Sequence, residues 1–78
     1  MMEEKLKELT LLMLYLQSWK ERMEILPRSW KGYDFDILNE LSDEGLTIDS
    51  KRAKSVLLTE DGISRAKEIA EKYGINVK

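Results

Sequence analysis

Apolar residues recur at helical spacing through the first third of the chain. On a helical wheel of this segment, one broad apolar face carries Leu9, Leu12, Met13, Leu16, Trp19 and Met23. Leu11 and Leu14 fall on the opposite side of the wheel. The pattern predicts a single long helix over residues 3 to 24, which Pro27 ends because proline has no amide hydrogen to donate.

The middle of this helix is apolar nearly all round, so it needs cover on two sides. One side can be the core of the domain itself. We expect the other side, which carries Leu11 and Leu14, to meet a second copy of the chain and form a homodimer. The alternative is that these two leucines sit exposed or lie under the C-terminal tail.

The rest of the chain predicts two shorter helices and a hairpin. A connector, "PRSWKGYD", leads to a helix over residues 35 to 44, with Asp34 as its cap and Gly45 in the left-handed position after its end. Residues 46 to 58 then alternate with the period of a strand on both sides of the polar turn "DSKRAK", which predicts a β-hairpin. Thr59 is expected to cap a last helix over residues 60 to 73. The expected fold class is α+β.

Length and composition narrow the possible functions. A chain of 78 residues predicts a single domain over residues 1–78. It has no cysteine and no histidine, which rules out disulfides and structural zinc sites, and no loop clusters oxygen ligands around a glycine. We therefore expect no metal or other cofactor. The apolar run over residues 9–16 is too short to cross a bilayer, so a cytoplasmic protein without a membrane partner is expected.

Catalysis is not expected from this set of side chains. Without histidine or cysteine, the chain lacks the usual proton-transfer group near neutral pH and the usual thiol nucleophile. No glycine-rich phosphate loop or dinucleotide fingerprint occurs, and no small-molecule site is evident. Asp36, Glu40 and Asp43 are placed on an exposed helix face, and a solvated surface explains them better than a catalytic role.

The order of the predicted elements resembles that of winged-helix transcription regulators. The resemblance is carried by "ILNELSDEGLTID" and "KSVLLTEDGISRAKEIA". These segments are similar to the stretch in which a recognition helix ends, the wing follows and the next helix begins. The resemblance implies a winged-helix-like domain of three helices with a two-stranded β-hairpin wing.

The chain also resembles a small family of compact domains that carry two motifs together. The motifs here are "WKGYDF", over residues 30–35, and "KSVLLTEDG", over residues 54–62. That family has no settled activity, so the resemblance implies an architecture and no chemistry.

Two functions stay open at this point. A winged helix that reads double-stranded DNA would place the helix before the wing in the major groove and the wing beside the phosphates. The basic residues available for such contacts are Arg28, Lys31, Lys51, Arg52 and Lys54. However, residues 34 to 49 contain six acidic residues and no basic one, and the net charge is −2. The alternative is a protein-interaction or dimerisation module with no DNA contact.

Overall fold

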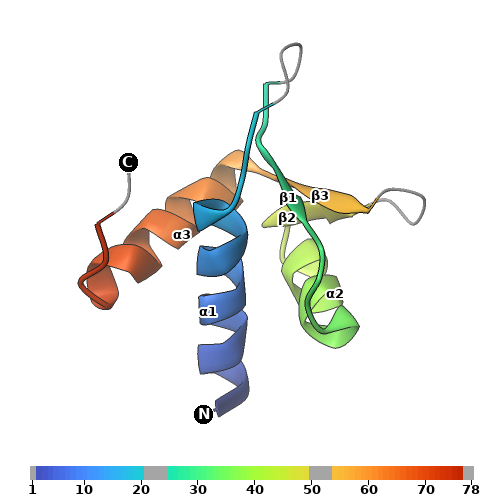
Figure 1. The fold of residues 1–78 in the computed structure, drawn as a ribbon. Helices are drawn as coiled ribbons and strands as arrows, with labels where there is room; N and C mark the ends of the chain where they lie inside the picture. Colours follow the sequence, from blue (N-terminus) through green and yellow to red (C-terminus); the bar gives the residue numbers. More distant parts are fainter. Residues whose placement is uncertain (1, 21–24, 50–53, 77–78) are drawn as a thin grey trace.

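The computed structural model describes residues 2–20, 25–49 and 54–76. The helices are α1 (Met2–Leu16), α2 (Phe35–Asp43) and α3 (Glu60–Lys72), and the strands are β1 (Arg28–Trp30), β2 (Thr47–Asp49) and β3 (Ser55–Leu58). In Figure 1, α1 stands between α3 and α2, with the sheet beyond one end of α1. The fold is α+β with three helices, as predicted.

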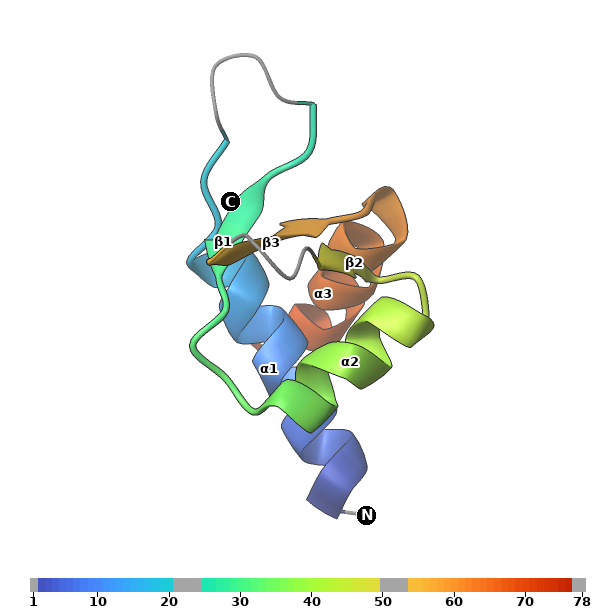
Figure 2. The ribbon, with the colours of Figure 1, turned by 90° about the vertical axis from the view of Figure 1, so that its right-hand side faces the viewer.

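The sheet has three antiparallel strands in the order β1-β3-β2, not the two predicted. Strands β2 and β3 pair as the expected hairpin, while β1 lies along the other edge of β3 (Figure 2). Arg28 pairs with Leu57, and Trp30 pairs with Ser55. The predicted irregular connector therefore begins with a strand, because β3 has a second free edge whose backbone groups need partners.

Helix α1 is shorter than predicted. It ends at Leu16 instead of residue 24, and the hydroxyl of Ser18 donates to the carbonyl oxygen of Tyr15 just beyond that end. Trp19 and Arg28 then exchange backbone hydrogen bonds of 2.8 and 2.6 Å in an isolated β-bridge. The chain has left the helix in order to extend the sheet, well before Pro27. Residues 21–24 of the predicted helix lie outside the described residues.

The buried side of α1 is opposite to the predicted one. Leu11 and Leu14 are 1% and 0% exposed, in the core that α1 forms with α2 and α3. This corrects the prediction that the two leucines form a dimer interface, since side chains buried within one chain are not free to contact a second copy. Leu12 is buried as expected, but Leu9 and Met13, also assigned to the core, are exposed.

Alternation along the hairpin predicts Ile48, Val56 and Leu58 in the core, with Thr47 and Leu57 on the outer face, and only β3 follows this prediction. Thr47 and Leu58 pair across β2 and β3, and both are buried. In the next register position Ile48 pairs with Leu57, and Arg28 lies on the far side of Leu57. Ile48 is exposed, against the prediction, and Leu57 is half-buried on the outer face, as predicted, so this face of the sheet carries a short apolar row.

The ends of α2 and α3 follow the predicted local signals. The Asp34 carboxylate accepts from the backbone N–H groups of Asp36 and Ile37, and the Thr59 hydroxyl accepts from the N–H of Gly62. Gly45 has a positive φ of 76° after α2, and the N–H of the next residue returns to the carbonyl of Leu41.

Two other details of α2 and α3 differ from the prediction. Phe35, whose spacing from Leu38 and Leu41 predicts a core position, is 71% exposed at the start of α2. The helices end one residue earlier than expected, at Asp43 and Lys72.

A close contact joins the start of α3 to the end of α2. The Leu46 carbonyl oxygen accepts a 3.1 Å hydrogen bond from the N–H of Thr59, whose hydroxyl donates to the Gly45 carbonyl at 2.7 Å. Gly62 is buried directly against this turn, and a Cβ added to it would lie 2.0 Å from the Leu46 carbonyl oxygen. Only glycine fits there without moving α3.

We expect Gly62→Ala to lower the free energy of unfolding by about 2–4 kcal/mol, because the added methyl group collides with backbone that cannot move aside cheaply. Urea denaturation of the purified protein measures the change. Gly32→Ala is the matched control, since no atom lies within 4 Å of a Cβ built at Gly32. Equal stability of the Gly62 and Gly32 variants would contradict the close contact.

Candidate interaction surfaces

The exposed face of α1 is apolar. Four residues form it, and we call them the α1 stripe: Leu6, Leu9, Met13 and Leu16. Their exposed fractions lie between 37% and 47%. Between residues 6 and 16, every side chain of α1 that is exposed belongs to this stripe. A surface helix normally presents polar residues to water. The apolar α1 stripe is exposed to water instead, without another surface packed against it.

Charged residues at the N-terminal half of α1 fix which face points inward. The Glu8 carboxylate accepts from the Lys72 ammonium at 3.1 Å and from the Tyr73 hydroxyl at 3.2 Å, which ties α1 to the end of α3. On the α2 side, the Lys7 ammonium pairs with Glu44 and lies 3.5 Å from Glu4. These contacts hold α1 by both flanks of its buried side, so the α1 stripe faces away from the core.

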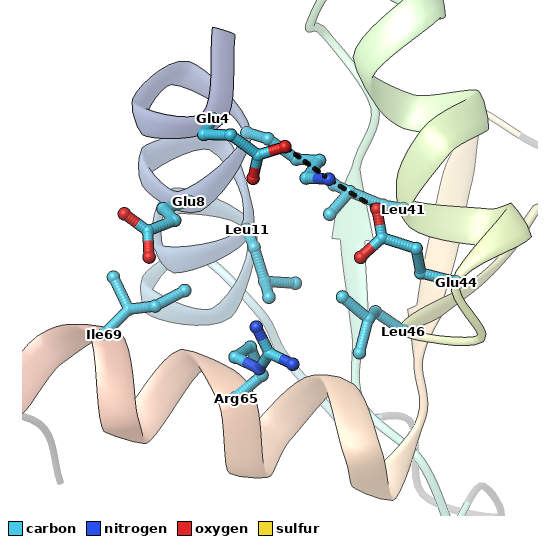
Figure 3. A pocket seen from close by; sticks show the side chains of 9 residues that line it. Glu4, Glu8, Leu11, Leu41, Glu44, Leu46, Arg65 and Ile69 are labelled. Carbon is cyan, nitrogen blue, oxygen red and sulfur yellow. Dashed lines mark hydrogen bonds and ion pairs between the residues drawn. The ribbon is translucent and has the colours of Figure 1, made fainter. Parts of the chain in front are cut away.

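A small cleft between the three helices is lined by four of these charged residues, Glu4, Lys7, Glu8 and Glu44 (Figure 3). Leu11, Leu46 and Ile69 line its apolar part, and Arg65 reaches toward it from α3. Its volume is about 50 Å³, room for a few water molecules and too little for a metabolite. The hydrogen bond to Glu44 raises the pKa of Lys7, which keeps that lysine charged at the cleft.

Two of the basic residues nominated for DNA contacts are engaged within the domain. The Lys31 ammonium lies 2.6 Å from the Asp49 carboxylate, and its side chain is only 14% exposed. The Arg28 guanidinium donates to the Ser55 hydroxyl at 3.1 Å, from a half-buried position. The ion pair between Lys31 and Asp49 links the end of β1 to the end of β2 across β3. A contact between Lys31 and a DNA phosphate would compete with this ion pair.

The remaining basic candidates are Lys51, Arg52 and Lys54. Lys54 is exposed beside β3, whereas Lys51 and Arg52 lie outside the described residues. The structure thus brings Lys31 and Lys54 to one end of the sheet, where the backbone N–H of Lys31 donates to the carbonyl of Lys54, and the Arg28 guanidinium reaches the same end at Ser55.

The outward face of α2 is acidic, as predicted. Asp36, Glu40 and Asp43 are all exposed along this helix. In a winged-helix reader this is the helix that would enter the major groove, and these carboxylates would approach the phosphates at its walls.

Comparisons with known proteins place the chain in a family. Residues 2–76 match the family described as "Domain of unknown function (DUF6429)". The chain belongs to the DUF6429 family. A relative of this DUF6429 chain is the protein named "Uncharacterized protein y4hR" of Sinorhizobium fredii (strain NBRC 101917 / NGR234), which is 32% identical over 68 residues, or 86% of this chain and 85% of the relative. No solved structure gives a significant match to the chain.

The family description carries no activity, so the resemblance to winged-helix regulators stays a prediction. Across residues 2–20, 25–49 and 54–76, no helix is both long and apolar enough to pass through a bilayer. Over the same residues, no three carboxylates come together as a metal-ion site would require.

Acid should loosen the attachment of α3 to α1. The hydrogen bond from Lys72 holds the pKa of Glu8 below its ordinary value of 4.5, so the folded state favours the ionised carboxylate. This stabilisation is present above pH 4.5 and is lost as the pH falls through the lower folded-state pKa.

We expect Glu8→Gln to reduce the loss of thermal stability between pH 5 and pH 3, as measured by circular dichroism melts across that range. Glu40→Gln, on the exposed face of α2, is the matched control and should keep the wild-type profile. A Glu8→Gln profile that parallels the wild type would show that the contact with Lys72 contributes nothing.

Proposed function

We propose that this DUF6429 chain is a protein-interaction module and that the α1 stripe is its docking surface. One observation carries the proposal: between residues 6 and 16, the exposed side chains of α1 are three leucines and one methionine. Single exposed leucines are common on soluble proteins, but a continuous apolar row along a helix marks a surface that another chain covers.

The energies involved are large enough to matter for so small a domain. Burying the exposed part of each stripe side chain contributes about 1 kcal/mol, or about 4 kcal/mol for the four residues on one chain. The total free energy of unfolding of a small domain is about 5–15 kcal/mol. A partner on the α1 stripe would therefore stabilise the domain by a substantial fraction of its own stability.

The charges of the domain also favour a protein partner. The net charge of −2 creates no field that would attract a polyanion. The exposed face of α2 carries Asp36, Glu40 and Asp43, and Lys31 is paired with Asp49. Each of these features weakens contact with phosphates, and none of them hinders docking of an apolar surface on α1.

DNA binding is the second candidate, and the arrangement of Arg28, Lys31 and Lys54 at one end of the sheet favours it. In a winged-helix-like layout β2 and β3 would form the wing, and Lys51 and Arg52 lie between these two strands in the sequence. Such a wing would lie beside the phosphate backbone and supply a contact that depends strongly on salt.

Site-specific photocrosslinking tests the docking surface. With p-benzoylphenylalanine in place of Leu9 and the protein made in its native host, we expect ultraviolet light to produce a covalent adduct of higher mass. Adding Met13→Glu should abolish the adduct, because a charge on the same stripe opposes burial. The same probe in place of Ile48, which is equally apolar and 50% exposed on the sheet, should give no adduct. Equal labelling from both positions, or none from position 9, would refute the proposed surface.

A duplex titration decides the DNA alternative. We expect the wild-type chain to show no binding to a mixed-sequence duplex in low salt, because the acidic α2 face opposes the phosphates. The comparison is a Lys51→Ala, Arg52→Ala, Lys54→Ala triple variant measured by fluorescence anisotropy. Wild-type binding that weakens steeply with salt and disappears in the triple variant would establish DNA binding instead.

A further inference from the structure

We infer that the partner on the α1 stripe is a second copy of the chain, whose own α1 lies antiparallel along the stripe. This inference rests on the proposed function, because it names the occupant of the same surface. It differs from the interface predicted from the sequence, which used Leu11 and Leu14 on the side of α1 that is buried.

The spacing of the α1 stripe suits the packing of two helices against each other. Its four residues are separated by three, four and three positions, the alternation by which two helices pack side chains of one into gaps of the other. This spacing reads the same in both directions along the helix. When two copies run antiparallel and are centred on the stripe, Leu6 meets Leu16 of the second copy, and Leu9 meets its Met13.

The pairing of stripe residues between two antiparallel helices is compatible with a dimer that has a two-fold axis. In a dimer with a two-fold axis, both chains use the same patch, so the patch must be complementary to itself. An antiparallel pair of α1 helices satisfies that condition over the whole α1 stripe.

The charge of Lys5 and the helix dipole favour the antiparallel direction. Lys5 is exposed next to the N-terminal end of the α1 stripe, and α1 has no basic residue in its last turn. The antiparallel arrangement places Lys5 beside Gln17 of the second copy, at the negative end of that copy's helix dipole. A parallel arrangement would instead set the two Lys5 side chains against each other and align the dipoles unfavourably.

The surroundings of the α1 stripe leave room for this contact. Among the described elements, α3, α2 and β1 make the main contacts with α1, and the four residues of the α1 stripe remain 37–47% exposed beside them. The other charged side chains of α1 next to the stripe, Lys7 and Glu8, point toward α2 and α3 through their ion pairs. Within residues 2–20, 25–49 and 54–76, the α1 stripe is open to a second helix.

The first measurement is the mass of the purified full chain by sedimentation equilibrium over about a hundredfold range of concentration. We expect a reversible monomer–dimer equilibrium for the wild type. Leu9→Glu should weaken association at least about a hundredfold, because it places a charge at the centre of the interface. Ile48→Glu, which adds the same charge at an exposed apolar residue outside the α1 stripe, should leave the dimer intact. Circular dichroism melts confirm that both variants fold.

The second measurement tests the direction. The natural chain has no cysteine, so every disulfide reports an introduced thiol. A mixture of Leu6→Cys and Leu16→Cys single variants should form a cross-linked dimer under mild oxidation. Neither variant alone should do so, because two copies of position 6 would lie about 15 Å apart along the paired helices. A disulfide within Leu6→Cys alone would indicate parallel helices and overturn the inferred arrangement.

The results of these measurements distinguish a failure of the homodimer from a failure of the docking surface. A wild-type chain that is monomeric at every concentration overturns self-association. If the photocrosslink from position 9 then joins the chain to a different protein, the docking surface stands and only the identity of its occupant is wrong. A dimer that Leu9→Glu leaves unchanged would place the dimer interface elsewhere and overturn this inference, and the crosslink from position 9 would still decide whether the α1 stripe is a docking surface.

Discussion

The contact between Gly62 and the Leu46 carbonyl sets the geometry of the whole domain. At this point the first turn of α3 lies directly on the turn that ends α2, with hydrogen bonds from Thr59 to Leu46 and Gly45 on one side of it. The position and direction of α3 are thereby fixed relative to α2 and the hairpin. Because α1 packs against α3 and α2 together, the same contact determines which side of α1 is buried. The α1 stripe is exposed as a consequence of this arrangement.

Local signals in the sequence predicted the ends of α2 and α3 well, because each cap involves residues only a few positions apart. Asp34, Thr59 and Gly45 act as their residue types and neighbours indicate. The third strand was not predictable in the same way. Its pairing partner, β3, lies more than twenty residues away in the sequence, and three residues are too few to show an alternating pattern. The role of Gly62 was missed for a related reason, since a glycine in a helix start reveals nothing of the backbone that will lie against it.

In the candidate surfaces too, features set by neighbouring residues were predictable, and features set by residues distant in the sequence were not. The acidic outward face of α2 was predictable from its period, whereas the pair between Lys31 and Asp49 depends on three strands meeting in one order. For α1, two apolar sides were visible, and the wider one was assigned to the core. A better signal was available in Lys7 and Glu8, two charges that flank the side of Leu11. A helix attached to its neighbours by such charges has that side turned inward, and the opposite apolar row is left facing solvent.

The ion pairs of α1 also bear on how well the exposed row could bind. A helix at the edge of a small domain tends to fray, and ordering it on contact with a partner would reduce affinity. Here Lys7 holds α1 to α2 through Glu44, and Glu8 holds it to α3 through Lys72, at neighbouring positions within the N-terminal half. Leu11 and Leu14 anchor the following turns in the core. The α1 stripe is therefore presented on a helix already fixed along most of its length, so little conformational entropy remains to be lost when a partner covers it.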